Sequence, residues 1–180
     1  MENLELEKLR YPIGKFEAPH NYSKEYIEEK IVEIASFPER LKAAVLHLNN
    51  NQLDTPYRKN GWTMRQVIHH CADSHMNCYI RIKWALTEDN PIIKYYHENL
   101  WSELKDNLTM PIEPTLALLD GLHFRLAFLM KGLSDEDMEK SFIHPEHSKE
   151  FKIKEIIGTY AWHGNHHLAH INALKNRENW

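Results

Sequence analysis

Residues 63–86 read TMRQVIHHCADSHMNCYIRIKWAL, and this stretch carries the clearest helix signal in the chain. Thr63 and Gln66 are spaced as a capping box, in which each side chain satisfies a free backbone amide of the first turn. Apolar residues then recur at helical spacing: Met64, Val67, Ile68, Cys71, Cys78 and Ile82. Polar residues and Pro91 end the pattern. We therefore predict an amphipathic helix from Thr63 to about Leu86.

Three other segments have the same helical character. Ser23 is placed as the N-cap of a helix that ends at residues 49–51, and Pro38 should break or kink it near its middle. A third helix is expected over residues 111–131 and a last one over residues 153–175. Between them we expect a long crossover with short helical turns at residues 91–110 and a polar loop at residues 144–150. No segment has strand periodicity, so the sequence predicts an all-α fold, a four-helix bundle with one long crossover connection.

The first 22 residues differ from the rest of the chain, because prolines, a glycine and aromatic residues occur there without a regular period. They include Tyr11, Pro12, Gly14, Phe16, Pro19 and Tyr22. We predict an extended N-terminal arm that packs on the bundle or on a partner subunit. The chain then divides into this arm (residues 1–22) and a single bundle domain (residues 23–180).

The composition excludes several classes of function. The 180 residues suit one domain, and the net charge of −4, with scattered lysines and arginines, argues against a nucleic-acid partner. No apolar run approaches the ~20 residues that a membrane-spanning helix needs, and the acidic N-terminus does not resemble a signal peptide. We therefore expect a cytoplasmic protein without a membrane or nucleic-acid partner. Cys71 and Cys78 lie roughly 10 Å apart along one helix, too far to bridge, and are expected to be core thiols.

Thirteen histidines are the unusual feature of the composition. In the last helix, His163 and His167 are four residues apart, His167 near the centre of the apolar stripe and His163 near its edge, so both rings can point at one position. The competing pair is His166 and His170, of which His166 should face solvent. An imidazole inside a bundle has a desolvation cost that metal coordination can offset. Gly164 stands where the zincin motif has its glutamate, so the spacing predicts a metal site without naming a reaction.

A third metal ligand must come from another helix. The helix over residues 63–86 offers His69, His70 and His75. His75 lies within its apolar stripe, His70 lies at the margin and His69 lies on the opposite face. The pattern alone leaves the choice between His70 and His75 open.

The stretch from Trp62 to Asp73 resembles the first signature of the DinB superfamily, which has a tryptophan, a capping Ser or Thr, a ligand histidine and an acid three residues later. The matching histidine is His70. The second signature, two histidines four apart followed by an isoleucine, matches residues 163, 167 and 171. Residues 10–16 and 84–101 resemble the YfiT-like branch in particular. Many members have Gly-Gln where Ala169 and His170 stand, so a role of His170 is left open.

The resemblance implies a DinB-like bundle that forms a homodimer and binds one divalent transition metal, nickel or zinc. His70, His163 and His167 would be its ligands, with coordination positions left open. It further implies a metal-dependent hydrolase that activates water toward a small-molecule substrate. The alternatives are a thiol S-transferase that uses a low-molecular-weight thiol of the bacillithiol type, and a non-catalytic metal-binding stress protein.

The sequence assigns no catalytic acid or base. Nearby candidates are Asp73, Glu98, Tyr160 and Asn165, and for each of them a structural role is the more common one. His123 has no partner in the sequence pattern, and His144 is expected in an exposed loop.

Overall fold

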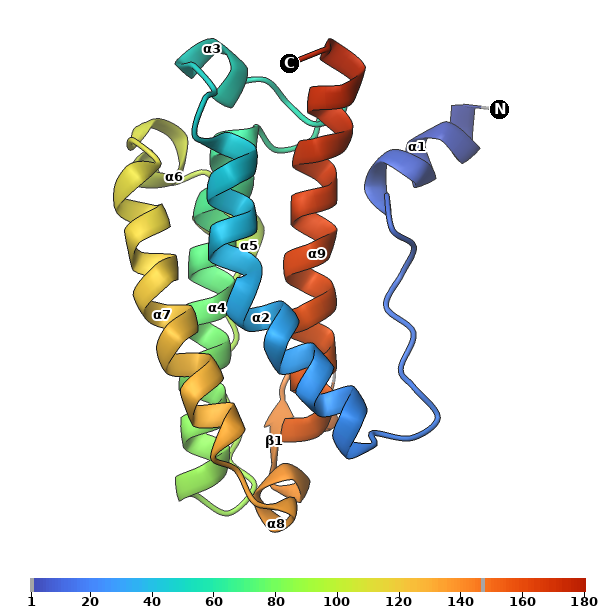
Figure 1. Ribbon diagram of the computed structural model, residues 1–180, viewed down its shortest axis with the longest axis vertical. Helices are drawn as coiled ribbons and strands as arrows, with labels where there is room; N and C mark the ends of the chain where they lie inside the picture. The colour runs from blue at the N-terminus through green and yellow to red at the C-terminus, as the bar shows by residue number, and fades with distance from the viewer. Residues whose placement is uncertain (1, 147) are drawn as a thin grey trace.

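The computed structural model describes residues 2–146 and 148–180, and four long helices form its body (Figure 1). They are α2 (Lys24–Val45), α4 (Met64–Thr87), α7 (Glu113–Lys131) and α9 (Ile153–Glu178). Helices α2 and α9 run in one direction, whereas α4 and α7 run in the other. Helix α2 packs against α9 and α7, and α4 packs against the same two helices, so neighbouring helices form a ring of four contacts. The predicted all-α four-helix bundle is confirmed.

The capping residues place the helix starts where the sequence predicts them. The Ser23 hydroxyl accepts a hydrogen bond from the Tyr26 amide at 3.2 Å, and α2 begins at the next residue. Pro38 remains inside α2 without ending it. Figure 1 shows that α2 changes direction near its middle, which is the kink expected from a residue without a backbone donor.

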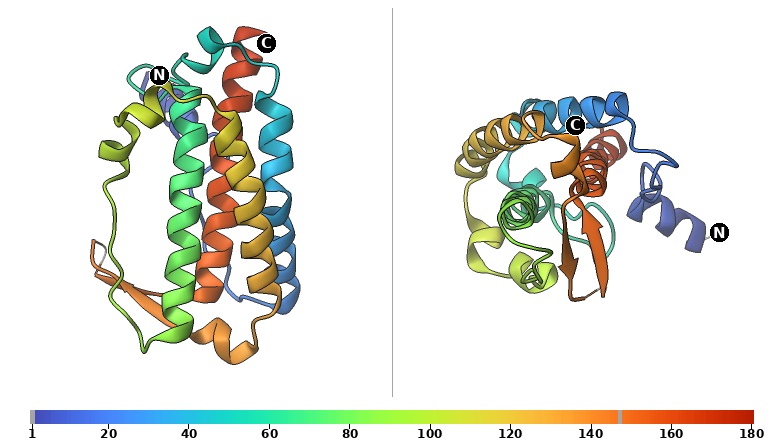
Figure 2. Two further views of the ribbon diagram at one scale, coloured as in Figure 1. Left: turned by 90° about the vertical axis from the view of Figure 1, so that its left-hand side faces the viewer. Right: turned by 90° about the horizontal axis from the view of Figure 1, so that it is seen from below.

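A long crossover joins α4 to α7, and it contains α5 (Glu98–Ser102) and α6 (Lys105–Thr109). It returns along the full length of the bundle, so α4 and α7 are parallel (Figure 2). The short helix α3 (Asn50–Leu53) lies in the connection between α2 and α4. The predicted crossover with short helical turns is confirmed.

The predicted polar loop at residues 144–150 is shorter than expected: residues 144, 149 and 150 belong to strands, and residues 145, 146 and 148 lie in the turn between them. After the short helix α8 (Asp135–Glu139), the strands β1 (Ser141–His144) and β2 (Lys149–Lys152) form an antiparallel hairpin. Strands of four residues are too short to show an alternating pattern, and β1 is held partly from outside the hairpin, by the Ile93–Ile143 backbone bond to the crossover at 3.1 Å. His144 is only 8% exposed, so the prediction of an exposed loop histidine is wrong.

The N-terminal arm is helical in its first part. Residues Glu2–Arg10 form α1, where an extended segment was expected, and Arg10 pairs with Glu7 one turn earlier at 3.1 Å. The remainder, residues 11–22, lacks regular structure and lies beside α9 of the same chain. The Tyr11 ring is 5.9 Å from the His166 ring, and the Phe16 ring is 6.1 Å from that of Trp162. The homodimer stays a prediction.

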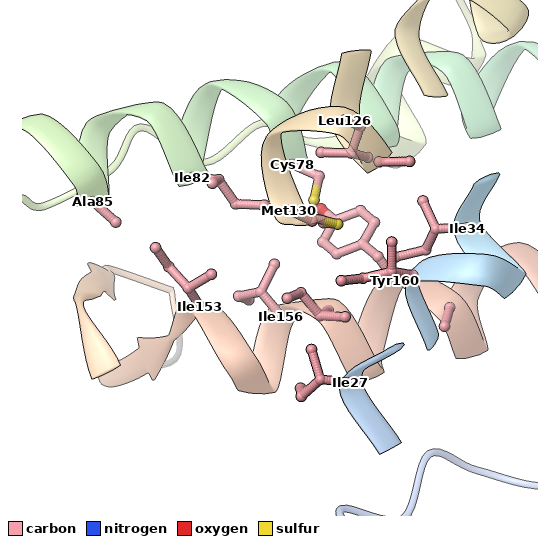
Figure 3. Packing of buried hydrophobic residues seen from close by; sticks show 14 of the residues in the cluster. Ile27, Ile34, Cys78, Ile82, Ala85, Leu126, Met130, Ile153, Ile156 and Tyr160 are labelled. Atoms are coloured by element: carbon pink, nitrogen blue, oxygen red, sulfur yellow. The ribbon is translucent and has the colours of Figure 1, made fainter. Parts of the chain in front are cut away.

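The buried apolar residues form two clusters, one in each half of the bundle. Figure 3 shows the cluster nearer the hairpin, where Cys78, Met130, Ile156 and Tyr160 meet. The other cluster includes Phe37, Leu41, Ile68, Cys71, Leu119 and Ile171. Both cysteines are buried and free, as predicted.

A histidine lies between the two clusters on each of three helices: His75 on α4, His123 on α7 and His163 on α9. The bundle therefore has a polar layer at its middle. Among the described residues, no helix has both the length and the apolar character needed to cross a membrane.

Candidate metal centre

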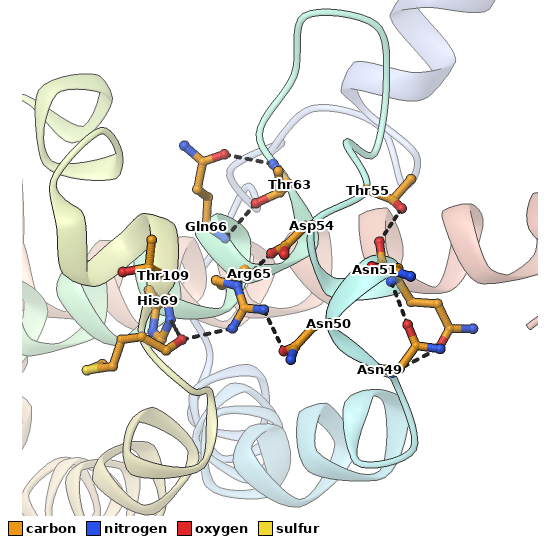
Figure 4. Close-up of polar contacts among 12 residues, drawn as sticks. Asn49, Asn50, Asn51, Asp54, Thr55, Thr63, Arg65, Gln66, His69 and Thr109 are labelled. Carbon is orange, nitrogen blue, oxygen red and sulfur yellow. Dashed lines mark hydrogen bonds and ion pairs between the residues drawn. The ribbon is translucent and has the colours of Figure 1, made fainter.

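The N-terminal end of α4 is fixed by a network of polar contacts (Figure 4). Gln66 and Thr63 form the predicted capping box, with bonds of 3.2 and 2.9 Å. The buried Arg65 guanidinium donates to Asp54 at 2.7 Å, to Asn50 at 2.9 Å and to the Met110 carbonyl at 2.9 Å. These contacts join α3, α4 and the end of the crossover. The helix that carries His70 is thereby held rigidly in the bundle.

His70, His163 and His167 converge, and one potential ligand nitrogen from each lies within 4.8 Å of the others. The Nε2 atoms of His70 and His163 are 3.2 Å apart. Two imidazole nitrogens at that separation could both reach one metal ion at the usual metal–nitrogen distance of about 2.0–2.1 Å. The structure thus brings together the three residues that the sequence predicts as a metal site.

All three imidazoles are held in the neutral form that metal binding requires. Burial lowers the pKa of His70 to about 4, with a further contribution from His166. Burial is the main reason why the pKa values of His163 and His167 lie well below the ordinary value, and the neighbouring histidines lower them further. Nδ1 of His167 is buried without a hydrogen-bond partner among the described residues. A cluster of desolvated lone pairs with an unsatisfied nitrogen fits a metal cation.

The structure places His75 behind His163 and not in the cluster. Its Nε2 lies 3.1 Å from Nδ1 of His163, and its Nδ1 lies 2.7 Å from Nε2 of His123. Nδ1 of His123 in turn lies 2.6 Å from the Ile34 carbonyl oxygen. Of the two histidines between which the pattern could not choose, His70 lies in the cluster and His75 does not.

His123 is a buried residue next to the site that the sequence did not predict. The signal was present, because this histidine occupies one position of an apolar helical stripe that is otherwise Leu116, Leu119, Leu126 and Met130. A lone histidine at such a position indicates a buried polar contact with another helix. The partner could not be identified from the sequence, since it depends on which helices are neighbours.

The prediction that His166 faces solvent is wrong, because the N-terminal arm covers it. His166 is 7% exposed, and its ring stacks on Trp162 at 4.5 Å. His170 lies against the same arm: its Nε2 is 3.1 Å from the Arg10 carbonyl, and its ring stacks on Tyr57 at 4.1 Å. This second histidine pair attaches the arm to α9. His69 also lies outside the cluster, and its Nδ1 is 2.7 Å from the Thr115 hydroxyl oxygen.

The candidate acid–base residues have different surroundings. The Asp73 carboxylate accepts a hydrogen bond from Asn107 at 3.0 Å, and burial raises its pKa. The Tyr160 ring is 5.7 Å from that of His163, and burial raises the pKa of its hydroxyl to about 12. Glu98 is exposed on α5.

Asn165 has a structural role. Its amide accepts from Arg40 at 2.7 Å and donates to Glu33 at 2.6 Å, which ties α9 to α2. The remaining candidates are Tyr160, whose ring lies against His163, and the half-buried Asp73, which follows His70 by one turn of α4.

A hollow of about 280 Å³ adjoins the cluster at His167. Its lining is polar and aromatic and comprises Arg10, Tyr11, Tyr57, Arg58, Asn60, Gly61, Trp62, Asn99, His166, His167 and His170. The Trp62 ring also packs on His70, with centroids 4.7 Å apart. The hollow therefore reaches one candidate ligand directly and a second through its aromatic neighbour.

Known proteins resemble this chain over nearly its whole length. A protein of Oceanobacillus iheyensis is 53% identical over 171 residues, covering 95% of this chain and 98% of the relative. A protein of Bacillus cereus is 52% identical over 172 residues, covering 96% and 98%. Both are named "Putative metal-dependent hydrolase".

A solved structure has the same fold. YfiT from Bacillus subtilis superimposes with a TM-score of 0.94 at 45% identity, covering 96% of this chain and 99% of that one. It is described as "a probable metal-dependent hydrolase with an unusual four-helix bundle topology". The family model of the DinB superfamily matches residues 33–171, which include all three clustered histidines. The chain belongs to the DinB superfamily, in its YfiT-like branch.

Proposed function

We propose that this protein is a metal-dependent hydrolase in which His70, His163 and His167 hold one divalent transition metal, nickel or zinc. The observation that carries the proposal is the convergence of three neutral imidazoles beside a polar hollow. The name "Putative metal-dependent hydrolase" of the sequence relatives and the description of YfiT as "a probable metal-dependent hydrolase" support the same class of activity.

The three histidines would hold the ion, and neighbouring residues fix their positions. A bound divalent ion supplies a Lewis acid that polarises a substrate carbonyl and acidifies water. Because the three ligands are neutral, they leave the positive charge of the ion undiminished. Trp62 packs on the His70 ring and restricts its rotation. Two ligands on the continuous helix α9 and one on α4 give the site a rigid frame.

The hollow favours a small substrate with an acidic group. Its volume of about 280 Å³ is near the lower end for small-molecule sites. Arg10 and Arg58 line it, and their guanidinium groups complement a carboxylate or a phosphate. A substrate anchored there would reach the cluster on the side of His167.

Metal analysis of matched variants tests the site. Protein made without a histidine tag should contain about one equivalent of nickel or zinc. His167→Ala should abolish binding, whereas His166→Ala, which removes a neighbouring histidine of nearly equal exposure (7% against 8%), should retain it. The opposite result would show that the ligand pair is shifted by one residue.

Turnover assays test the reaction. Metal-loaded protein should hydrolyse activated esters or amides with water alone, and faster when the substrate carries an acidic group. Activity that begins only when a low-molecular-weight thiol is added would replace the hydrolase by an S-transferase. If the loaded protein does neither across a broad panel, the site is structural and the enzyme proposal fails.

A further inference from the structure

We propose that His123 and His75 form a hydrogen-bonded relay that holds His163 as its Nδ1–H tautomer, with the Nε2 lone pair directed at the metal site. The relay starts at the Ile34 carbonyl and ends at Nδ1 of His163. Only the expected effect of the relay on metal binding rests on the proposed function. The tautomer itself is a property of the protein without metal.

The relay begins at a carbonyl that the helix leaves without its usual partner. In α2, the Ile34 oxygen would normally accept from the amide of residue 38, but residue 38 is a proline and has no amide hydrogen. Nδ1 of His123 lies 2.6 Å from this oxygen. The proline that kinks α2 thus provides an acceptor inside the bundle for a side chain of α7.

The direction of the relay follows from counting protons. A carbonyl can only accept, so His123 must carry its hydrogen on Nδ1, and its Nε2 is then an acceptor. His75 must therefore donate from Nδ1 across 2.7 Å, which leaves its own Nε2 as an acceptor. Nδ1 of His163, 3.1 Å from that atom, must be a donor. Nε2 of His163 keeps its lone pair and faces Nε2 of His70 at 3.2 Å.

This assignment of one proton to each imidazole requires that the relay histidines are neutral. His75 and His123 are each 1% exposed, so burial opposes a second proton on either ring. Burial lowers the pKa of His123 to about 4. The Phe37 ring packs on both, with centroids 5.3 Å away in each case, and keeps this part of the bundle apolar. The four groups of the relay come from the four long helices: the Ile34 carbonyl from α2, and one histidine each from α4, α7 and α9.

A relay of this kind should strengthen metal binding. The second nitrogen of a ligand histidine normally donates to a fixed acceptor, which sets the ring orientation and makes the ligand atom more basic. Here the acceptor is the His75 imidazole, which is fixed by His123, and His123 is fixed by the Ile34 carbonyl. His75 and His123 act through His163 and are positioning residues.

Nuclear magnetic resonance of the metal-free protein tests the tautomer directly. Two-bond ¹H–¹⁵N correlations at pH 7.5 distinguish the Nδ1–H from the Nε2–H form of each imidazole. The expected result is Nδ1–H for His123, His75 and His163, and Nε2–H for His70, which must donate to the bare nitrogen of His163. Adding zinc should leave the His163 tautomer unchanged and remove the hydrogen from Nε2 of His70.

Zinc affinity of matched variants tests the consequence. His75→Phe keeps an aromatic ring but removes the acceptor, and should weaken zinc binding roughly 10–100-fold, as losses of such outer contacts do. His75→Gln, whose amide can accept from His163 and donate to His123, should lose less. The control is His69→Phe, which removes another buried histidine of α4 whose partners are Thr115 and the Met110 carbonyl.

The outcomes separate the relay from the metal site. An Nε2–H tautomer of His163 in wild-type protein overturns the relay even if zinc binds tightly, and this measurement needs no variant to fold. Equal zinc affinities of folded His75→Phe and His69→Phe overturn its role in binding. If wild-type protein binds neither zinc nor nickel while His163 has the Nδ1–H form, the proposed function fails and the relay stands.

Discussion

Gly164 has a steric role that explains the absence of an acidic side chain beside the two histidines of α9. A Cβ atom at this position would lie 2.9 Å from Cδ2 of the Phe37 ring, a separation that real side chains essentially never show. Phe37 is 1% exposed and contacts both relay histidines, so it has little room to move. The close packing of α2 against α9 therefore leaves no room for a side chain at position 164.

Gly164→Ala should therefore destabilise the protein by about 1–3 kcal/mol, the usual cost of overpacking a core. It should also weaken zinc binding, because a displaced Phe37 disturbs His75. Urea denaturation and zinc titration measure the two effects. The control is Gly121→Ala on the exposed face of α7, where a Cβ meets no atom within 4 Å. That change should stabilise the helix by about 0.5–1 kcal/mol, and equal effects at both positions would contradict the steric account.

The candidate site could be predicted only in part from residue spacing. The pair at positions 163 and 167 follows from helix geometry, which is local. The choice of His70 over His75 needed the resemblance, because two residues five apart on one helix differ only in which neighbour they face. His123 and its contact with the Ile34 carbonyl depend on the packing of α7 against α2. That information is not contained in any single helical stripe.

At the scale of elements, the long helices could be predicted because their capping residues and apolar stripes are local signals. The hairpin β1–β2 and the helix α1 could not. The backbone of β1 bonds to the crossover, whose approach is decided by the tertiary fold. Helix α1 has a mostly polar sequence without a clear stripe, although an i,i+3 pair of Glu7 and Arg10 supports it.

The N-terminal arm should contribute to stability through the aromatic contacts of residues 11–16 with α9. Deleting residues 1–16 should leave the bundle helical by circular dichroism but lower the free energy of unfolding by about 1–3 kcal/mol, because two half-buried aromatic side chains are lost. The emission of Trp162 should shift to longer wavelength as it becomes exposed.

A shorter deletion provides the control for the arm. Removing residues 1–9 keeps the Arg10 carbonyl that His170 contacts, together with Tyr11 and Phe16, and should change stability little. If the longer deletion is as stable as the full chain, the arm contacts contribute nothing measurable.

At the scale of the whole molecule, the bundle is two apolar clusters joined across a layer of neutral histidines. The fold class follows from four amphipathic segments, but the parallel pairing of α4 with α7 follows from a crossover long enough to return along the bundle. Charging an imidazole in this layer has a desolvation cost that opposes folding. The stability of the protein must therefore depend on pH.

We expect the metal-free protein to lose stability as the pH falls from about 6.5 toward 4. The pKa values of His123 and His170 are lowered from 6.5 to about 4, mainly by burial. Between these values the unfolded chain binds protons that the folded chain does not, so protonation favours unfolding. Each such histidine should cost ~1.4 kcal/mol at pH 5.5.

Urea denaturation in the presence of a chelator, at pH 7.5, 6.5 and 5.5, measures this loss. A few such histidines account for a large share of a typical stability of about 5–15 kcal/mol, so the midpoint should fall steeply below pH 6.5. Asp137 does not contribute to this decline: its bonds to Lys140 and Ser134 lower its pKa to about 2, so its stabilising contribution is lost mainly as the pH falls below about 4. A midpoint that is constant from pH 7.5 to 5.5 would mean that the histidine layer is already charged, or hydrated, in the folded protein.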